Sequence, residues 1–316
     1  MYLRPLDASS DFKALAALLA FGEPEPPTPE LLQEWEGNAP VELVRQRMVA
    51  IDDAGGAGII GYCDAAHWPW DTPGQFTVAA LVAPAYRRQG LGARLAEATL
   101  AFVRQQGATR LIAEVRDNVP EGLRFAERYD FRRDRHIFES RLHLATFDER
   151  PFADTIGSVE AEGIRFITLA DVGDIDAARR ALYDLNATLV QDIPGHDGTF
   201  MPFEQFQKTV CSASWYRPDG QIVAASGDTW VGMAAVGYFE ATNSMYNMIT
   251  GIEPAWRGKG IALALKLLAV ACARRYGAAY ITTNNDSENA PMLAINRKLG
   301  YQPEPGFYRM VREPAF

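Results

Sequence analysis

Two short stretches place basic residues and glycine at the start of an apolar helical pattern. Residues 87–92 read RRQGLG and residues 257–262 read RGKGIA. The first backbone N–H groups of a helix have no intrahelical partner, and the helix dipole adds partial positive charge there. Glycine lets a ligand approach the backbone closely, and Arg and Lys add full charge. Each turn therefore predicts a binding site for a pyrophosphate or a similar anion.

The two turns belong to a repeat with an offset of 170 residues, because Arg87 aligns with Arg257 and Phe131 with Tyr301. One such turn alone is equally well explained as a glycine-containing helix cap with solvated cations. Two copies in register favour the anion site. Neither turn has the Walker pattern GxxxxGK[ST] or the dinucleotide fingerprint GxGxxG, which excludes those two phosphate-binding motifs.

The helix after each turn must pack on a sheet, because its apolar residues recur at helical spacing on one face. In each half, a short strand comes first, three strands precede this helix, and a strand, a helix and a last strand follow it. The strands of the first half are expected at 2–6, 43–51, 58–66, 75–83, 110–116 and 136–144, and its last two helices at 91–106 and 120–129. Those of the second half are expected at 164–169, 222–228, 230–240, 245–253, 279–285 and 307–312, with helices at 261–276 and 289–299.

This order predicts an α+β fold of two tandem domains, each a mixed, mostly antiparallel sheet with helices on both faces. It differs from the strict alternation of a dinucleotide-binding fold. We expect an N-terminal domain over 1–146 and a C-terminal domain over 163–316. The polar stretch 147–162 between them has little periodicity and is interpreted as a linker.

The composition argues against two classes of binding partner, nucleic acid and membranes. A formal net charge of −9 argues against nucleic acid, since phosphate binding needs a basic face. The most apolar run, IALALKLLAVACA, is too short to span a bilayer and is interrupted by Lys266, so no membrane association is expected. Cys63, Cys211 and Cys272 are far apart and odd in number, which favours buried thiols in a reducing cytoplasm.

Both turns fit the [QR]-x-x-G-x-[GA] pattern of the GCN5-related N-acetyltransferase (GNAT) family, and the order of elements around them is similar. NAPMLAINRKLGY (289–301) resembles the family's second conserved block. The resemblance covers both halves and is to the tandem members, a group that includes the mycothiol synthase type. It implies acetyl-CoA as acetyl donor and a primary amine of a small molecule as acceptor. The carboxylates of the two loops expected over the acceptor suit a cationic amine.

The resemblance also implies where acetyl-CoA binds. Its pyrophosphate is expected on the amides of the two turns, and its pantetheine arm beside the strand before each turn, where two parallel strands diverge. In the C-terminal half these residues are Thr250, Gly251, Ile252, Arg257, Gly258, Lys259, Gly260, Ile261 and Ala262. In the N-terminal half they are Ala80, Leu81, Val82, Arg87, Arg88, Gln89, Gly90, Leu91 and Gly92. Asn284 and Asn289 are expected to face the cofactor, with ordinary turn and helix capping as the alternative.

An amine must lose a proton before it attacks, so a base is required. By resemblance, the usual Glu base falls on Tyr246, or on Phe76 in the first half, and the usual Tyr acid on Asn296, or on Ala126. Both usual residues are therefore missing. Asn296 is interpreted as a hydrogen-bond donor to the departing sulfur or the cofactor, against the alternative of a helix-surface amide.

The acceptor is expected beneath two loops, 191–206 and 22–35. The first offers Asp192, His196 and Asp197, and His196 is a candidate proton acceptor near neutral pH. Glu240 and Asp228 are further candidates. We expect the C-terminal domain to be catalytic and the N-terminal domain to be a degenerate copy. The alternative is a non-catalytic acyl-CoA-binding or sensing protein. A monomer with an internal pseudo-dimer and a homodimer both fit the sequence.

Overall fold

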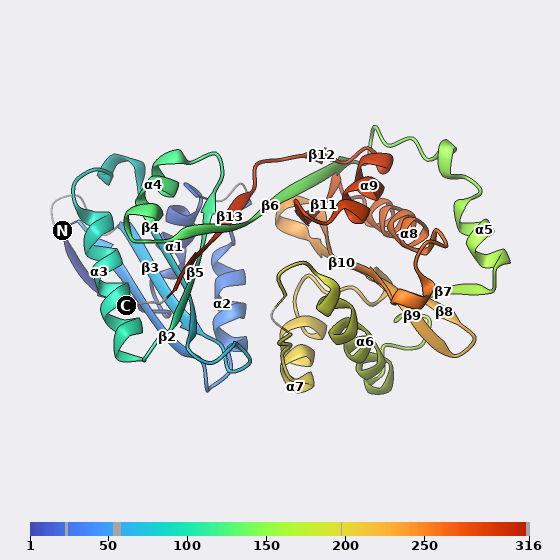
Figure 1. The fold of residues 1–316 in the computed structure, drawn as a ribbon, viewed down its shortest axis with the longest axis horizontal. Helices are drawn as coiled ribbons and strands as arrows, with labels where there is room; N and C mark the ends of the chain where they lie inside the picture. The colour runs from blue at the N-terminus through green and yellow to red at the C-terminus, as the bar shows by residue number, and fades with distance from the viewer. Residues whose placement is uncertain (23–24, 53–57, 197, 314–316) are drawn as a thin grey trace. The chain divides into compact units, whose positions relative to one another are not determined.

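The computed structural model describes residues 1–22, 25–52, 58–196 and 198–313. The chain divides into two compact units (Figure 1). Unit 1 comprises Met1–His136 and Phe307–Phe316, and unit 2 comprises Ile137–Gly306. Among the described residues, no helix is both long and apolar enough to cross a membrane. Within the same residues, no group of three or more His, Cys, Asp or Glu side chains is arranged to hold a metal ion.

Unit 1 is built on a six-stranded sheet in the order β1-β2-β3-β4-β5-β13, in which only the β4–β5 pair is parallel. Its strands are β1 (Tyr2–Pro5), β2 (Val44–Ile51), β3 (Ile59–His67), β4 (Gln75–Val82), β5 (Arg110–Arg116) and β13 (Phe307–Arg312). Its helices are α1 (Phe12–Leu19), α2 (Pro29–Asn38), the 3₁₀ turn η1 (Pro84–Tyr86), α3 (Leu91–Gln105) and α4 (Pro120–Arg128). Val49 packs with α1 while its neighbour Ala50 packs with α3, so these helices cover opposite faces.

Unit 2 repeats this plan in the order β6-β11-β10-β9-β8-β7, again with one parallel pair, β10–β11. Its strands are β6 (Arg132–His143), β7 (Ile164–Thr168), β8 (Gln221–Ser226), β9 (Thr229–Phe239), β10 (Ser244–Ile252) and β11 (Tyr280–Asp286). Only the part of β6 from Ile137 onward belongs to unit 2. The short strand β12 (Gln302–Pro303) pairs with β6. Its longer helices are α5 (Thr155–Ala161), α6 (Asp176–Leu189), α7 (Phe203–Phe206), α8 (Ile261–Arg275) and α9 (Ala290–Leu299). Short helical turns are η2 (Arg150–Phe152), η3 (Val190–Asp192), the π turn η4 (Gln207–Cys211), η5 (Pro218–Gly220), η6 (Glu240–Thr242) and η7 (Pro254–Trp256).

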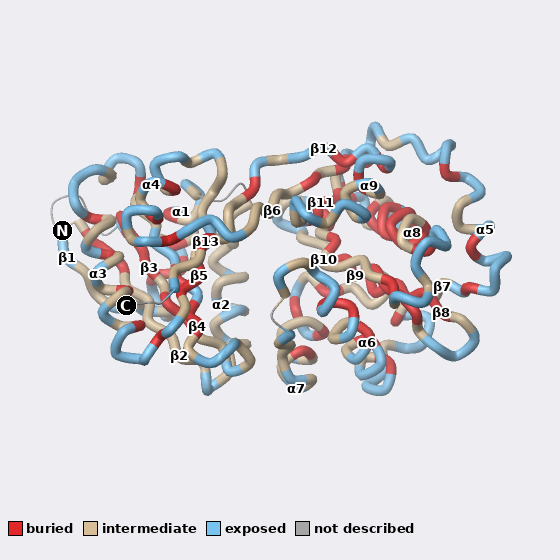
Figure 2. The backbone as a smooth tube through the Cα atoms, in the orientation of Figure 1, coloured by how far each residue is buried: buried red, intermediate tan, exposed pale blue. Residues whose placement is uncertain are grey.

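Two apolar clusters lie on opposite faces of the unit 2 sheet. Ile222 and Ala224 pack with α8, whereas Val223 between them packs with α6. Figure 2 shows α8 buried along most of its length, and nine of its fifteen residues are buried. A helix that is apolar on nearly all sides belongs in the interior.

The predicted α+β fold of two tandem domains is confirmed, but the compact units differ from the predicted ranges at the last strand of each half. The sequence places 136–144 in the first half, yet β6 pairs with β11 of unit 2. Likewise β13, at the end of the second half, pairs with β5 of unit 1. The two halves thus exchange their last strands. The alternation of side chains along a strand does not identify the strand beside it, so periodicity could not assign the partner of either strand.

Residues 147–162, interpreted as a linker, contain η2 and α5 instead. Phe152 and Val159 are buried in the apolar cluster of unit 2. These two buried side chains stand in an otherwise polar segment, which is too sparse a pattern to be recognised as amphipathic.

Candidate active site

The two glycine-containing turns, here called cradles (87–92 and 257–262), have the same backbone conformation. Gly258 and Gly260 both have φ of +79°, and Arg88 and Gly90 have φ of +62° and +82°. Positive φ angles of this size favour glycine, and Arg88 has such an angle although it is not a glycine. In each cradle the first arginine donates from Nε to the carbonyl at the end of the preceding strand: Arg257 to Ile252 at 3.0 Å and Arg87 to Val82 at 3.1 Å.

Three of the four cationic side chains of the cradles already have protein partners. Arg257 pairs with Asp192, and Arg87 lies 3.4 Å from Glu121. The Lys259 ammonium lies 4.4 Å from the centre of the Trp256 ring. Backbone N–H groups at the start of α8 and α3 are therefore the first donors available to an anion, and the cations add a positive field.

The parallel strands before each cradle diverge. The pairing of β10 with β11 runs from Ser244–Tyr280 to Tyr246–Thr282, although β10 continues to Ile252. In unit 1 the pairing of β4 with β5 ends equally early, at Thr77. We call the segment beyond the last pair the splay. In each unit the splay lies directly before the cradle, where the two parallel strands are no longer paired.

The splay of unit 2 contains a β-bulge that unit 1 lacks. The pairing of β10 with β9 shifts between Asn247 and Ile249, whereas the pairing of β4 with β3 is regular. Met248 is the extra residue, so the offset between the halves is 169 before the bulge and 170 after it. The structural counterpart of Tyr246 is consequently Thr77. A gap-free offset of 170 predicts Phe76 instead.

A set of buried polar side chains lies beside the splay, on the face covered by α8. Asn247 accepts at Oδ1 from the Lys266 ammonium at 3.0 Å and from the Thr250 hydroxyl at 2.9 Å. Its Nδ2 donates to the carbonyls of Ala235 and Ile249. Its own carbonyl accepts from the Thr283 hydroxyl on β11 at 3.0 Å, which connects the two diverging strands.

The set continues along β11. Asn285 donates to the Ser140 hydroxyl on β6 at 2.8 Å and accepts from Nδ2 of Asn296 on α9 at 2.5 Å. Asn296 is only 3% exposed, so the alternative of a helix-surface amide is wrong. Its Oδ1 atom is buried and has no hydrogen-bond partner among the residues that the structure describes. Buried polar atoms are rarely left unpaired, and an orphan of this kind requires an explanation such as a ligand donor.

We call these seven residues the polar network: Ser140, Asn247, Thr250, Lys266, Thr283, Asn285 and Asn296. Their counterparts in unit 1, aligned through strand pairing and the common helix register, are all apolar. They are Met310, Val78, Ala80, Ala96, Ala113, Val115 and Ala126. The two units therefore share the cradle and the splay but differ completely in what lies beside them.

The remaining predicted site residues are distributed around unit 2. Asn289 caps α9 by accepting from the Met292 N–H at 3.3 Å, as the capping alternative describes. Asn284 is exposed on β11. His196 accepts at Nδ1 from the Gly198 N–H at 3.1 Å. Tyr246 is half-buried at the last paired position of β10.

One acidic candidate is engaged away from the splay, one is exposed in a turn, and one lies outside the described residues. Glu240 pairs with Arg217 at 3.2 Å in η6, before the start of β10, whereas the splay is at its end. Asp228 is exposed in the turn between β8 and β9. Asp197 lies outside the described residues, as do residues 23 and 24 of the loop 22–35.

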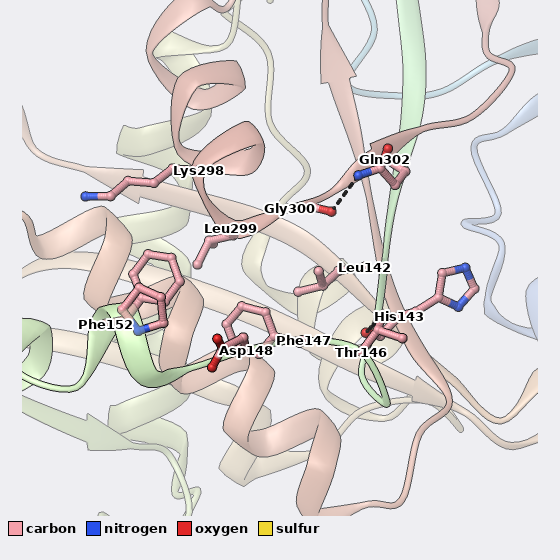
Figure 3. Close-up of a pocket in the computed structure, with 11 residues that line it drawn as sticks. Leu142, His143, Thr146, Phe147, Asp148, Phe152, Lys298, Leu299, Gly300 and Gln302 are labelled. Carbon is pink, nitrogen blue, oxygen red and sulfur yellow. Dashed lines mark hydrogen bonds between the residues drawn. The ribbon is translucent and has the colours of Figure 1, made fainter.

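A pocket of about 440 Å³ lies elsewhere in unit 2 (Figure 3). Its lining includes Leu142, Phe147, Phe152 and Lys298. Leu142 pairs with Ile281 at the start of β11, whereas the splay follows the middle of that strand. The pocket and the splay are therefore different places on the sheet.

Sequence reasoning missed Lys266, Asn247 and Asn285. Lys266 was used only to exclude a membrane span. A lysine inside an otherwise apolar helix is itself a signal, since lysine is almost never fully buried without a partner. At the offset of 170, Lys266 aligns with Ala96, so the other half has an apolar residue at the same position, which strengthens that signal.

Comparisons with known proteins agree with this architecture. Residues 12–131 match the family model described as Acetyltransferase (GNAT) family. A mycothiol acetyltransferase of Saccharomonospora viridis is 27% identical over 320 residues, covering 96% of this chain and 95% of the relative. Another, of Acidothermus cellulolyticus, is 27% identical over 236 residues and covers 70% of this chain and 67% of that protein. A solved tandem GNAT protein from the clavulanic acid biosynthesis pathway has a TM-score of 0.76 at 21% identity, with 99% and 98% of the two chains covered, which is a likeness of fold.

Proposed function

We propose that the chain is a tandem N-acetyltransferase of the GNAT type, that it transfers the acetyl group of acetyl-CoA to a primary amine of a small, cationic acceptor, and that unit 2 performs the chemistry. The observation on which this rests most directly is the polar network beside the splay of unit 2. Unit 1 has a cradle of the same conformation, but only apolar side chains at the corresponding positions.

The residues present in unit 2 fit acetyl-CoA. The cradle 257–262 offers the unpaired N–H groups of a helix start, which suit a pyrophosphate. The end of β10, Thr250 to Ile252, has backbone groups beyond its pairing with β11 that suit the amides of a pantetheine arm. The buried Oδ1 of Asn296, which has no partner in the described part of the chain, suits an N–H or S–H donor in the same place. When bound, acetyl-CoA supplies an acetyl group activated as a thioester.

The chain's own residues would then stabilise the developing oxyanion, hydrogen-bond the departing sulfur and orient the amine. The bulge at Met248 turns backbone groups of β10 out of the regular ladder, and a backbone N–H there is a suitable donor to a developing oxyanion. Asn296 and Asn285 lie on the α9 side, where a side-chain amide can hydrogen-bond a departing sulfur. Tyr246 ends the paired part of β10 and is our candidate for orienting the amine.

No carboxylate occupies the predicted base position in either unit, since Tyr246 and Thr77 stand there. The proton of the acceptor amine must then leave to water or to a more distant group, and His196 remains our candidate for the latter. Unit 1 is proposed to be a degenerate copy. The free, buried state of all three cysteines supports placement in the cytoplasm.

Charge and the relatives' name support the proposed acceptor class. Asp192 of η3 pairs with Arg257 beside the cradle, which places an acidic side chain near the start of the acceptor loop. A cationic amine is a suitable partner for such a loop. The curated relatives are named mycothiol acetyltransferases, so the unacetylated amine of mycothiol belongs in an acceptor panel with amino acids, polyamines and aminoglycosides.

The test is acetyl-CoA-dependent thiol release by the full chain in the presence of that panel. The proposal expects at least one amine to stimulate thiol release well above hydrolysis, with acetylated amine detected by mass spectrometry. If acetyl-CoA binds but no amine stimulates release, the protein is an acyl-CoA-binding module and the proposal fails.

A further inference from the structure

Lys266 is buried in the middle of α8. It is 1% exposed, and among the described residues no carboxylate forms an ion pair with it. Its ammonium contacts Asn247 Oδ1 at 3.0 Å and lies 5.1 Å from the centre of the Tyr301 ring. Burial alone lowers the pKa of Lys266 to about 7. A methionine of similar volume would avoid this cost, so the folded chain retains an amine where packing does not need one.

The partner of Lys266 is the residue that begins the bulge. The Asn247 side chain accepts from Lys266 and from Thr250, and donates across the bulge to the Ile249 carbonyl at 2.9 Å. It therefore links the residues on both sides of Met248. With the donation to Ala235 as well, all four hydrogen-bonding positions of the amide are used.

The lysine, the asparagine and the bulge occur together. Unit 1 has Ala96 and Val78 at the two side-chain positions, and its β4 runs past without a bulge. The cradle is kept in both units, so these three features are not required to form a cradle or a splay. They are specific to the unit whose splay contains the polar network.

We propose that Lys266 is a positioning residue of the acetyl-transfer site. From inside the core it fixes the amide of Asn247, and Asn247 in turn holds the bulged backbone at Met248 in the orientation that receives the thioester carbonyl. Lys266 touches neither the donor nor the acceptor and acts through Asn247. This inference rests on the proposed function for the identity of the reacting group, but its structural part is testable without any acceptor.

The first arm of the test is hydrogen–deuterium exchange on the full chain without ligand. Lys266→Met should raise the exchange rate of the amides of residues 247–250 at least tenfold. Val270→Ala is the matched control, since Val270 lies one turn further along α8 and is equally buried. It should leave those amides within twofold of wild type. Equal exchange at 247–250 in wild type and Lys266→Met would overturn the proposal.

The second arm uses acetyl-CoA as the probe and then the amine that stimulates turnover. Lys266→Met should bind acetyl-CoA within twofold of the wild-type Kd, because the cradle is unchanged, while kcat falls at least tenfold. Lys266→Gln, which keeps an N–H donor toward Asn247, should recover part of kcat. An unchanged kcat in Lys266→Met would overturn the positioning role. Failure of the wild type to bind acetyl-CoA would instead refute the proposed function, and the first arm would still decide whether Lys266 holds the bulge.

Discussion

Replacing Lys266 by methionine should stabilise the folded chain at neutral pH, and the gain should vanish in alkali. The ordinary lysine pKa is 10.5, whereas burial lowers the pKa of Lys266 to about 7 in the folded state. Between these values the unfolded chain binds a proton that the folded chain does not. Wild-type stability therefore rises with pH across that window, and the penalty is largest near its lower end.

The magnitude follows from these two pKa values. At pH 7.5, releasing the proton costs the folded state about 4 kcal/mol relative to a side chain that does not titrate, and at pH 10 about 1 kcal/mol. Methionine loses the hydrogen bond to Asn247, which costs about 1 kcal/mol. Lys266→Met should thus be more stable than wild type by about 3 kcal/mol at pH 7.5 and nearly equal to it at pH 10.

Urea unfolding at both pH values measures this difference. Val270→Ala removes buried apolar atoms from the same helix, so its lower free energy of unfolding identifies the transition that belongs to α8. Because neither valine nor alanine titrates, this loss should not depend on pH. A Lys266→Met gain that is the same at pH 7.5 and pH 10 would refute the reasoning. So would a loss of stability at pH 7.5.

Two further predictions concern the polar network and the thiols. Asn296→Ala should lower kcat by about tenfold to a hundredfold with little change in acetyl-CoA affinity, because it removes a side chain beside the splay and not the cradle; an unchanged kcat in steady-state assays would remove Asn296 from the site. Burial raises the pKa of the Cys63 thiol, that of Cys211 to about 11 and that of Cys272 to about 12. The native chain should therefore react with a disulfide reagent at pH 8 at least tenfold more slowly than the unfolded chain, and fast labelling of all three thiols in the native chain would contradict the buried placement.

Much of the fold could be predicted from the sequence, because it depends on local patterns. Apolar residues at helical spacing after each turn indicated α3 and α8, and the positive φ values in both cradles agree with the glycines that suggested them. The repeat at an offset of 170 predicted two copies of one domain. These features are set by residues close together in the chain.

Features set by distant partners could not be predicted in the same way. The exchange of β6 and β13 depends on which sheet each strand joins, and the alternation along a strand does not identify its neighbour. The bulge at Met248 shifts the register by one residue, so a gap-free alignment gave Phe76 where Thr77 stands. The polar network brings together side chains from β6, β10, β11, α8 and α9, and no one segment contains enough of them to be recognised.

The division of labour between the units is tested most directly by calorimetric titration of acetyl-CoA into wild type, Gly260→Val and Gly90→Val. Both glycines have φ near +80°, so valine strains the two cradles equally and each variant is the control for the other. We predict one site per chain in wild type, lost in Gly260→Val and retained in Gly90→Val. A site that survives in Gly260→Val and disappears in Gly90→Val would place acetyl-CoA in unit 1 and contradict the central claim.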